Sequence, residues 1–216
     1  MSDLTLILGN KAYSSWSLRP WLALKQAGLP FTETVIPLRQ PDTAARIRSH
    51  SPSGRVPCLI HGGITVWDSL AICEYVAEIA PGAGLWPADR TARAVARSIS
   101  SEMHSGFASL RNTMSMDLKR DRHGEGMTPE TAADIARIET LWADARAGSG
   151  RGSETGGPFL FGGFTIADAM FAPVVTRLET YGVAVRPETR AYMDAVLALP
   201  ALRQWIADAK AEPWVL

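Results

Sequence analysis

The chain has 216 residues, and its 22 basic and 22 acidic side chains leave no formal net charge at pH 7. This balance excludes the strongly basic surface that binding to nucleic acid or to an anionic membrane requires. Hydrophobic residues make up 46% and charged residues 20%, which is typical of a folded globular protein and argues against extensive disorder. The length fits one large domain or two small ones.

The cysteines and the apolar segments narrow the class of protein further. Cys58 and Cys73 lie too far apart for a CxxC motif and have no Cys or His neighbours at zinc spacing, so we expect neither a metal site nor a disulfide framework. A reducing, cytoplasmic location is the default for such a chain. The first residues carry an acidic side chain where a signal peptide carries basic ones. No apolar run approaches the roughly 18 residues that a membrane span needs.

Strand and helix signals alternate over residues 1–80. We expect strands over 4–8, 31–36, 58–60 and 64–67, and helices over 17–27, 44–49 and 69–80. This order predicts one parallel crossover followed by a hairpin, and therefore a small α/β domain. The segment 81–89 (PGAGLWPAD) is rich in proline and glycine and predicts a linker.

Residues 90–216 carry helix signals and no convincing strand. We expect helices over 91–118, 129–147, 166–180, 188–199 and 201–209. The Gly- and Ser-rich segment 148–158 predicts a loop, and Thr165 with Asp168 matches the pattern of a capping box. The apolar ending 212–216 is expected to dock on the protein. The sequence therefore predicts a larger all-α domain after the linker.

Three serines lie between the first strand and the first helix, namely Ser14, Ser15 and Ser17. A strand-to-helix turn presents backbone N–H groups and the positive end of a helix dipole, so a serine hydroxyl there can help to hold an anion. The same residues are also typical helix caps, and capping is the simpler interpretation. The surrounding residues do not form a Ser-His-Asp arrangement or a nucleophile elbow, which argues against a covalent serine hydrolase.

Two further features favour a peptide-like ligand. A cis bond between Val56 and Pro57 would leave the Val56 backbone able to pair with an extended ligand, although trans is the commoner form. Asp68 and Ser69 begin the helix expected over 69–80, where they are typical caps. A carboxylate there also pairs with a ligand ammonium, while a serine hydroxyl and helix N–H groups hold a ligand carboxylate. Together they suit an α-amino acid head group.

These segments resemble the cytosolic glutathione S-transferase family, in particular its bacterial, serine-type members. SPSGRVPCLIHGGITVWDSLAICEYVAE, residues 51–78, is similar to the thiol-peptide site of that family. GFTIADAMFAP, residues 163–173, resembles the capping box of its helical domain. YSSWSLRPWLALK, residues 13–25, resembles the serine turn of the zeta-like and tau-like classes. The resemblance extends over essentially the whole chain.

The resemblance implies a fold and a way of activating a thiol. The fold would be a thioredoxin-like, glutathione-binding domain over 1–80, a linker over 81–89 and an all-helical domain over 90–216 that lines the electrophile site. Ser14, with Ser15 as the alternative, would donate a hydrogen bond to the thiol of glutathione. Because a free thiol titrates near pH 8.5, such a donor and the helix N-terminus are needed to favour the thiolate at neutral pH.

The resemblance also implies how the rest of glutathione is held. The backbone of Val56, beside a cis Pro57, would pair with the cysteinyl part. Asp68 and Ser69 would hold the γ-glutamyl end. Arg55 stands where related proteins often carry Lys or Gln, near the glycyl carboxylate, and a solvated surface arginine is an equally good interpretation of it.

A basic strip is expected on the helix over 91–118, because the spacing of His104 and Arg111 places them on one helix face. If that face borders the cleft, the strip would hold an anionic electrophile or the glycyl end of glutathione; a solvated face is the simpler alternative. Trp16 flanks the serine turn and is expected to touch the ligand. Trp67 is expected to pack in the core or between the domains.

The activity implied by the resemblance is that of a glutathione S-transferase in detoxification, with glutathione as co-substrate and a hydrophobic electrophile. The same resemblance implies a homodimer without metal. Two alternatives stay open: a glutathione-dependent isomerase similar to maleylacetoacetate isomerase, and a non-catalytic carrier of hydrophobic ligands. The turn over 9–17 contains no cysteine, which weakens the isomerase alternative and disfavours thiol exchange by an enzyme cysteine.

Overall fold

The fold is given by a computed structural model that describes residues 3–148 and 157–216. In chain order the elements are β1 (Leu4–Gly9), α1 (Ser15–Gln26), β2 (Thr32–Ile36), α2 (Thr43–Arg48), β3 (Cys58–His61), β4 (Ile64–Trp67), α3 (Ser69–Ile79), α4 (Arg90–Ser105), α5 (Ala108–Thr113), α6 (Pro129–Gly148), α7 (Ile166–Thr180), α8 (Pro187–Leu197) and α9 (Pro200–Ala211). Most of the loop expected over 148–158 lies outside the described residues. Within the described residues, no helix has the length and apolar character of a membrane span.

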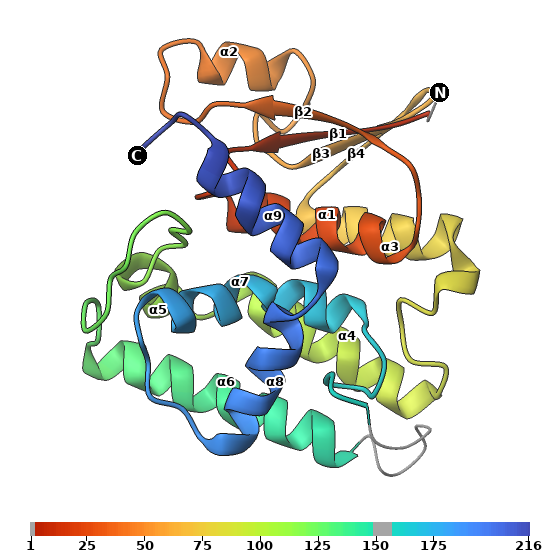
Figure 1. The fold of residues 1–216 in the computed structure, drawn as a ribbon. Coiled ribbons are helices and arrows are strands. Elements are labelled where there is room, and N and C mark those ends of the chain that lie inside the picture. The colour runs from red at the N-terminus through yellow and green to blue at the C-terminus, as the bar shows by residue number, and fades with distance from the viewer. Residues whose placement is uncertain (1–2, 149–156) are drawn as a thin grey trace.

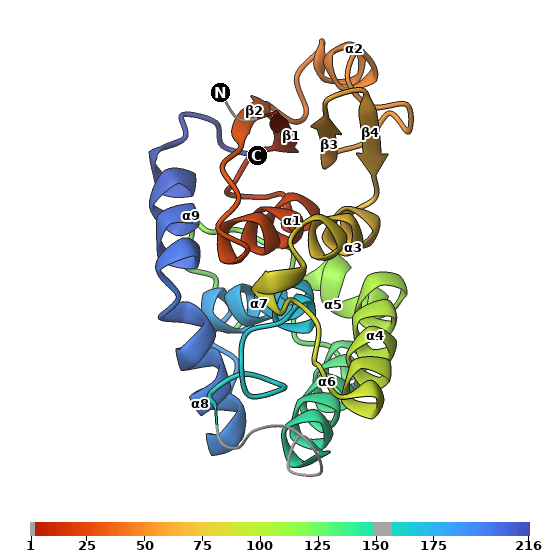
Figure 2. The ribbon, with the colours of Figure 1, turned by 90° about the vertical axis from the view of Figure 1, so that its right-hand side faces the viewer.

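The first half of the chain forms a four-stranded sheet in the order β2-β1-β3-β4. β1 pairs with β2 in parallel and with β3 antiparallel, and β3 and β4 form the expected hairpin. The apolar run LTLILG makes β1 a central strand that is buried over most of its length. α1 and α3 cover one face of the sheet and α2 lies on the other, as Figures 1 and 2 show. The expected parallel crossover followed by a hairpin is confirmed.

The second half is helical in the described residues outside its loops and packs beneath α1 and α3 (Figure 2). α7 is its central element and is buried along nearly its whole length against α1 and α4. Trp142 of α6 packs edge-on against Phe171 of α7 and Tyr192 of α8, which joins three helices in one core. The capping box of Thr165 and Asp168 is present at the start of α7.

The expectation of a single long helix over 91–118 is wrong, because the helix is interrupted at Gly106, between α4 and α5. Phe107 adopts the left-handed conformation with φ of 61° and its side chain is buried. A Cβ on Gly106 would lie 2.9 Å from the Glu102 carbonyl oxygen, so only glycine lets the chain turn this closely past the end of α4. The guanidinium of Arg111 then donates to the carbonyls of Gly106 and His104 and closes the end of α4.

The C-terminal segment docks on the turn between β1 and α1, as expected, but through polar contacts. The Glu212 carboxylate accepts hydrogen bonds from the backbone N–H groups of Lys11 at 2.7 Å and Ala12 at 3.2 Å. The buried Lys11 ammonium pairs with Glu33 of β2 at 2.6 Å and with Asp208 of α9 at 2.7 Å. These contacts tie α9 and the tail to the sheet beside the turn that contains Ser14.

Candidate functional site

A cleft of about 540 Å³ opens where α1, the approach to β3, the β4–α3 junction and the end of α4 meet. Its lining residues are Trp16, Ser53, Arg55, Val56, Pro57, Trp67, Asp68, Ser69 and His104. The cleft thus brings together most of the residues proposed from the sequence. Ser14, Ser15 and Arg111 lie outside this lining.

The approach to β3 presents backbone to the cleft. The Val56–Pro57 peptide bond is cis, as the resemblance implied. No other described residue makes a hydrogen bond with the Val56 backbone. Arg55 is exposed at the rim, and its backbone N–H donates to the Ser53 hydroxyl at 3.3 Å. An extended ligand can therefore pair with the main chain at Val56, with a cationic side chain beside it.

Asp68 caps α3 and also faces the cleft. One oxygen of its carboxylate accepts from the Leu70 backbone N–H at 2.9 Å, and the other lies 3.2 Å from Nε2 of His104. Asp68 holds a positive φ of 74°, a conformation that a short polar side chain can stabilise locally. The Ser69 hydroxyl is buried and has no hydrogen-bond partner in the described part of the chain. A carboxylate beside an unused donor is suited to both charges of an amino acid.

The serine turn serves first as the N-terminal cap of α1. The helix begins at Ser15, two residues earlier than expected, and Ser14 is its cap. The Ser14 oxygen accepts from the Ser17 N–H at 3.3 Å, and its hydroxyl donates to the Ser17 oxygen at 2.8 Å. Within the described residues, the Ser15 hydroxyl has no hydrogen-bond partner. The capping interpretation of Ser14 is therefore correct, and its hydroxyl is engaged with Ser17.

Trp16 lies between positive groups at the edge of the cleft. The Arg19 guanidinium is 4.4 Å and the Arg111 guanidinium 4.6 Å from the centroid of its ring. The ring also meets His104 edge-on at 5.3 Å. Because 37% of Trp16 is exposed, its indole can touch a ligand on one side while it covers the two arginines on the other. His104 of α4 lines the cleft and Arg111 of α5 lies behind Trp16, so the two residues come from different helices and do not form the single helix face expected from their spacing.

Trp67 and Ser53 were missed by the sequence analysis. Trp67 is 47% exposed and lines the cleft, so the expectation that it packs in the core is wrong. It ends β4, which is one of the two edge strands of the sheet and is exposed over most of its length. A signal was available, because Trp67 directly precedes the Asp68–Ser69 pair that was proposed as a binding site.

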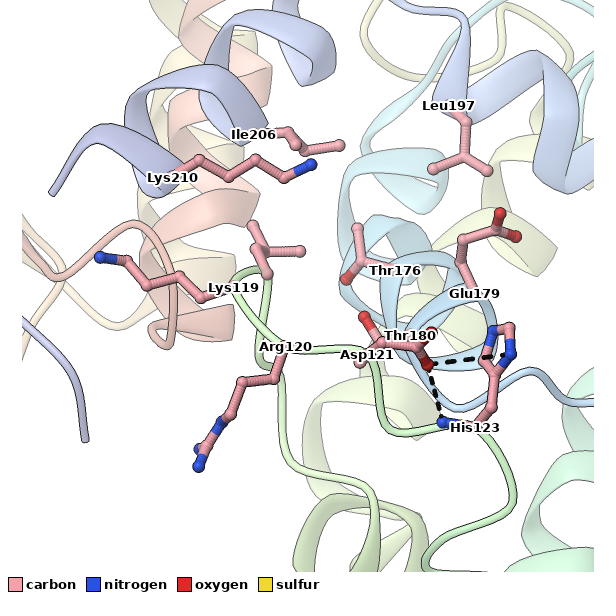
Figure 3. A pocket seen from close by; sticks show the side chains of 11 residues that line it. Lys119, Arg120, Asp121, His123, Thr176, Glu179, Thr180, Leu197, Ile206 and Lys210 are labelled. Carbon is pink, nitrogen blue, oxygen red and sulfur yellow. Dashed lines mark hydrogen bonds and ion pairs between the residues drawn. The ribbon is translucent and has the colours of Figure 1, made fainter.

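A second pocket of about 410 Å³ lies apart from this cleft, beside α7 and α9. In Figure 3, Lys210 and Ile206 of α9 stand across from Thr176 and Glu179 of α7. Lys119, Arg120, Asp121 and His123 come from the segment before α6, and Leu118, Thr180 and Leu197 complete the lining. None of the site residues proposed from the sequence contributes to this second lining.

Comparison with known proteins identifies the family. Family models for the N-terminal and C-terminal domains of glutathione S-transferases match residues 13–79 and 123–208. Maleylacetoacetate isomerase of Rattus norvegicus is 30% identical over 201 residues, which cover 88% of this chain and 85% of that protein. The chain belongs to the glutathione S-transferase family. The probable maleylacetoacetate isomerase of Caenorhabditis elegans is 33% identical over 104 residues, which cover 48% of each chain.

Solved structures of transferase homologues have the same fold. A glutathione transferase homologue from Burkholderia GL BGR1, with bound glutathione, has a TM-score of 0.68 and 27% identity, covering 96% of this chain and 98% of that one. A homologue from Sulfitobacter, also with bound glutathione, has a TM-score of 0.63 and 26% identity, covering 94% and 97%. The present chain is therefore a glutathione-dependent enzyme with a thioredoxin-like first domain and a helical second domain, as expected.

Proposed function

We propose that the protein catalyses conjugation of glutathione to a small apolar or aromatic electrophile. The observation that supports this best is the convergence of three recognition features in one cleft: the unpaired Val56 backbone, the Asp68 carboxylate and the unpartnered Ser69 hydroxyl. The cysteinyl part would pair with Val56, the γ-glutamyl ammonium with Asp68 and its carboxylate with Ser69. The glycyl carboxylate would then lie toward Arg55.

The chemistry requires a thiolate and a surface for the electrophile. A hydroxyl of the serine turn, from Ser14 or Ser15, would donate to the sulfur, and the N-terminus of α1 would add to the favourable field. The thiol proton passes to water, a sulfur–carbon bond forms, and the leaving group departs with its bonding electrons. Trp16 and Trp67 supply aromatic faces in the same cleft against which an aromatic electrophile packs.

The experiment is a titration of the ultraviolet thiolate absorbance of bound glutathione. We expect a bound-thiol pKa well below the free value in the wild-type protein. A hydrogen bond to a charged group contributes about 1.5–3 kcal/mol, so loss of the donor raises this pKa by about 1–2 units. Ser14→Ala and Ser15→Ala are compared separately, and the larger rise identifies the donor.

Ser98→Ala is the matched control, because Ser98 is an exposed serine of α4 whose hydroxyl donates to the Ala94 carbonyl of the same helix. It should leave the bound-thiol pKa unchanged. Absence of glutathione binding, or a bound thiol that titrates like the free one, would overturn the transferase proposal and favour a carrier of hydrophobic ligands.

A second candidate is a glutathione-dependent isomerase, favoured by the similarity to proteins named maleylacetoacetate isomerase. Product analysis separates the two. With maleylacetoacetate, an isomerase forms the trans isomer and returns glutathione unchanged, whereas a conjugating enzyme consumes glutathione in proportion to product. We expect consumption with aryl halide electrophiles.

We also propose a cytoplasmic homodimer, with the chain divided at the 81–89 linker, as the family resemblance implies. Light scattering would give twice the chain mass of 23.4 kDa for a dimer. A mass of one chain at micromolar concentration would contradict this.

A further inference from the structure

Three guanidinium groups, two of them buried and one half-buried, lie near one another where α1 packs on the helical half. Arg19 of α1 is fully buried, Arg177 of α7 is 3% exposed and Arg111 of α5 is half-buried. They lie close enough that the charges of Arg111 and Arg177 act on Arg19. None of the three forms an ion pair with a carboxylate in the described residues. Like charges in such a position repel each other, and the protein interior does not screen them as water does.

Arg19 is the most unusual member of this cluster. All three of its side-chain nitrogens are buried without a hydrogen-bond partner among the described residues. Burial, and then the two neighbouring arginines, hold its pKa well below its usual range. Burial likewise lowers the pKa of Arg177 to about 10. Because an unpaired buried charge destabilises a fold, stability by itself would favour an apolar side chain at position 19.

The cluster lies directly behind the cleft. The Trp16 indole lines the cleft and lies against the guanidiniums of both Arg19 and Arg111. Two other titratable groups nearby carry no charge at pH 7. His104 of α4 has a lowered pKa and is neutral at pH 7, and the Cys73 thiol of α3 has a raised pKa and stays protonated. Among the described residues, Asp68, the N-cap of α3, is the one carboxylate that acts on Arg19, and Asp134 of α6 is the one that acts on Arg111.

We infer that Arg19, supported by Arg111, stabilises the glutathione thiolate through its electrostatic field across Trp16. This rests on the proposed function. Once the ligand ammonium pairs with Asp68, no other carboxylate of the described chain acts on Arg19, and an anion on the far side of Trp16 supplies a counter-charge. Ser14 can donate to the sulfur only after its hydroxyl leaves Ser17, whereas a fixed charge acts without rearrangement. Arg19 is thus a positioning residue that does not touch the substrate.

The test compares Arg19→Met with wild type in the same thiolate titration at saturating glutathione. Methionine keeps much of the side-chain volume and removes the charge. We expect the bound-thiol pKa to rise by about one unit. We also expect the melting temperature of the ligand-free protein to stay the same or increase, because an unpaired buried charge is removed. If the role of Arg19 were merely structural, the bound-thiol pKa would stay unchanged and the melting temperature would fall.

Two more variants complete the experiment. Lys210→Met removes one positive charge from the second pocket, whose lining shares no residue with the cleft, and should leave the bound-thiol pKa unchanged. Arg111→Met should raise it, and this variant decides the matter if Arg19→Met does not fold. The Arg19→Met and Ser14→Ala effects should add, because field and hydrogen bond act independently.

The outcomes separate this inference from the proposed function. If wild-type protein does not bind glutathione or does not lower its thiol pKa, the proposed function fails. If wild type lowers the pKa and both arginine variants keep the full shift, the inference is overturned while the transferase proposal stands. An equal rise in Lys210→Met would also overturn it, because the effect would then reflect net charge and not the cluster.

Discussion

His104 lies in the cleft beside Asp68, and its protonation state decides how much of the Asp68 charge is available to a ligand. Its Nε2 lies 3.2 Å from the Asp68 carboxylate, which favours the imidazolium form. Burial, the larger influence, lowers the pKa of His104, and the charges of Arg19 and Arg111 lower it further. His104 is therefore neutral at pH 7 and does not cancel the Asp68 charge. The full charge of Asp68 stays available for a ligand ammonium.

This state of His104 predicts how glutathione affinity depends on pH. As pH falls below the usual histidine range and through the lowered pKa of His104, the imidazolium forms and competes with the ligand ammonium for Asp68. We expect the dissociation constant, measured by calorimetry from pH 8 to pH 5, to rise by about tenfold at the acid end, which corresponds to about 1.4 kcal/mol. His104→Asn should remove this dependence, and the exposed His50→Asn should retain it. An identical profile in His104→Asn contradicts the argument.

Elements whose boundaries depend on nearby residues were predicted well from the sequence, and those fixed by distant contacts were not. The apolar run of β1 and the Thr128–Pro129 start of α6 carry their own signals. The break at Gly106 does not, because Met103, Phe107 and Leu110 continue a helical apolar spacing across it. Only the packing of α4 and α5 in three dimensions shows that the chain must turn there.

At the start of α7, the sequence and the structure together predict how much Asp168 contributes to stability. The buried Asp168 carboxylate accepts hydrogen bonds from the backbone N–H groups of Leu160 and Thr165, the Thr165 hydroxyl and the Tyr192 hydroxyl. Asp168→Ala leaves these buried donors without an acceptor, so we expect the free energy of unfolding to fall by about 3–5 kcal/mol in denaturant titrations. This exceeds the effect of losing an ordinary helix cap, about 1 kcal/mol. Asp42→Ala is the control. Asp42 is exposed and makes no capping hydrogen bond, so its replacement should change the free energy of unfolding little.

The stability lost in Asp168→Ala should also depend on pH in a defined direction. Burial raises the pKa of Asp168 to about 6, above its unfolded value of 3.8. Between these values the native state holds the proton more tightly than the unfolded chain, so the wild-type protein gains stability from this group as pH falls from 7 to 5. The difference between wild type and Asp168→Ala should therefore be larger at pH 5. A difference that shrinks at pH 5 would contradict burial as the dominant influence.

At the scale of the whole molecule, segments about two hundred residues apart hold the turn that leads to Ser14. Lys11 accepts at its carbonyl from the Trp205 indole N–H at 2.9 Å, and its N–H donates to Glu212. The Ala12 carbonyl accepts from the Leu118 N–H at 3.2 Å. The sequence indicated that the tail docks, but it offered no means of finding these partners. The anion-binding backbone groups predicted for this turn are in part occupied by the chain's own carboxylate.

The tail therefore controls the rigidity of the serine turn. Glu212→Ala removes charge-assisted hydrogen bonds of about 1.5–3 kcal/mol each, so we expect amide hydrogen exchange at Lys11 and Ala12 to accelerate about 10- to 100-fold. Amides of β1 should keep their protection, because that strand is paired on both sides. Val215→Ala changes an exposed tail side chain and should alter amide exchange neither in the turn nor in β1. Unchanged exchange in Glu212→Ala would mean that Trp205 and Leu118 hold the turn without the tail, and that the last residues could be removed without effect on the site.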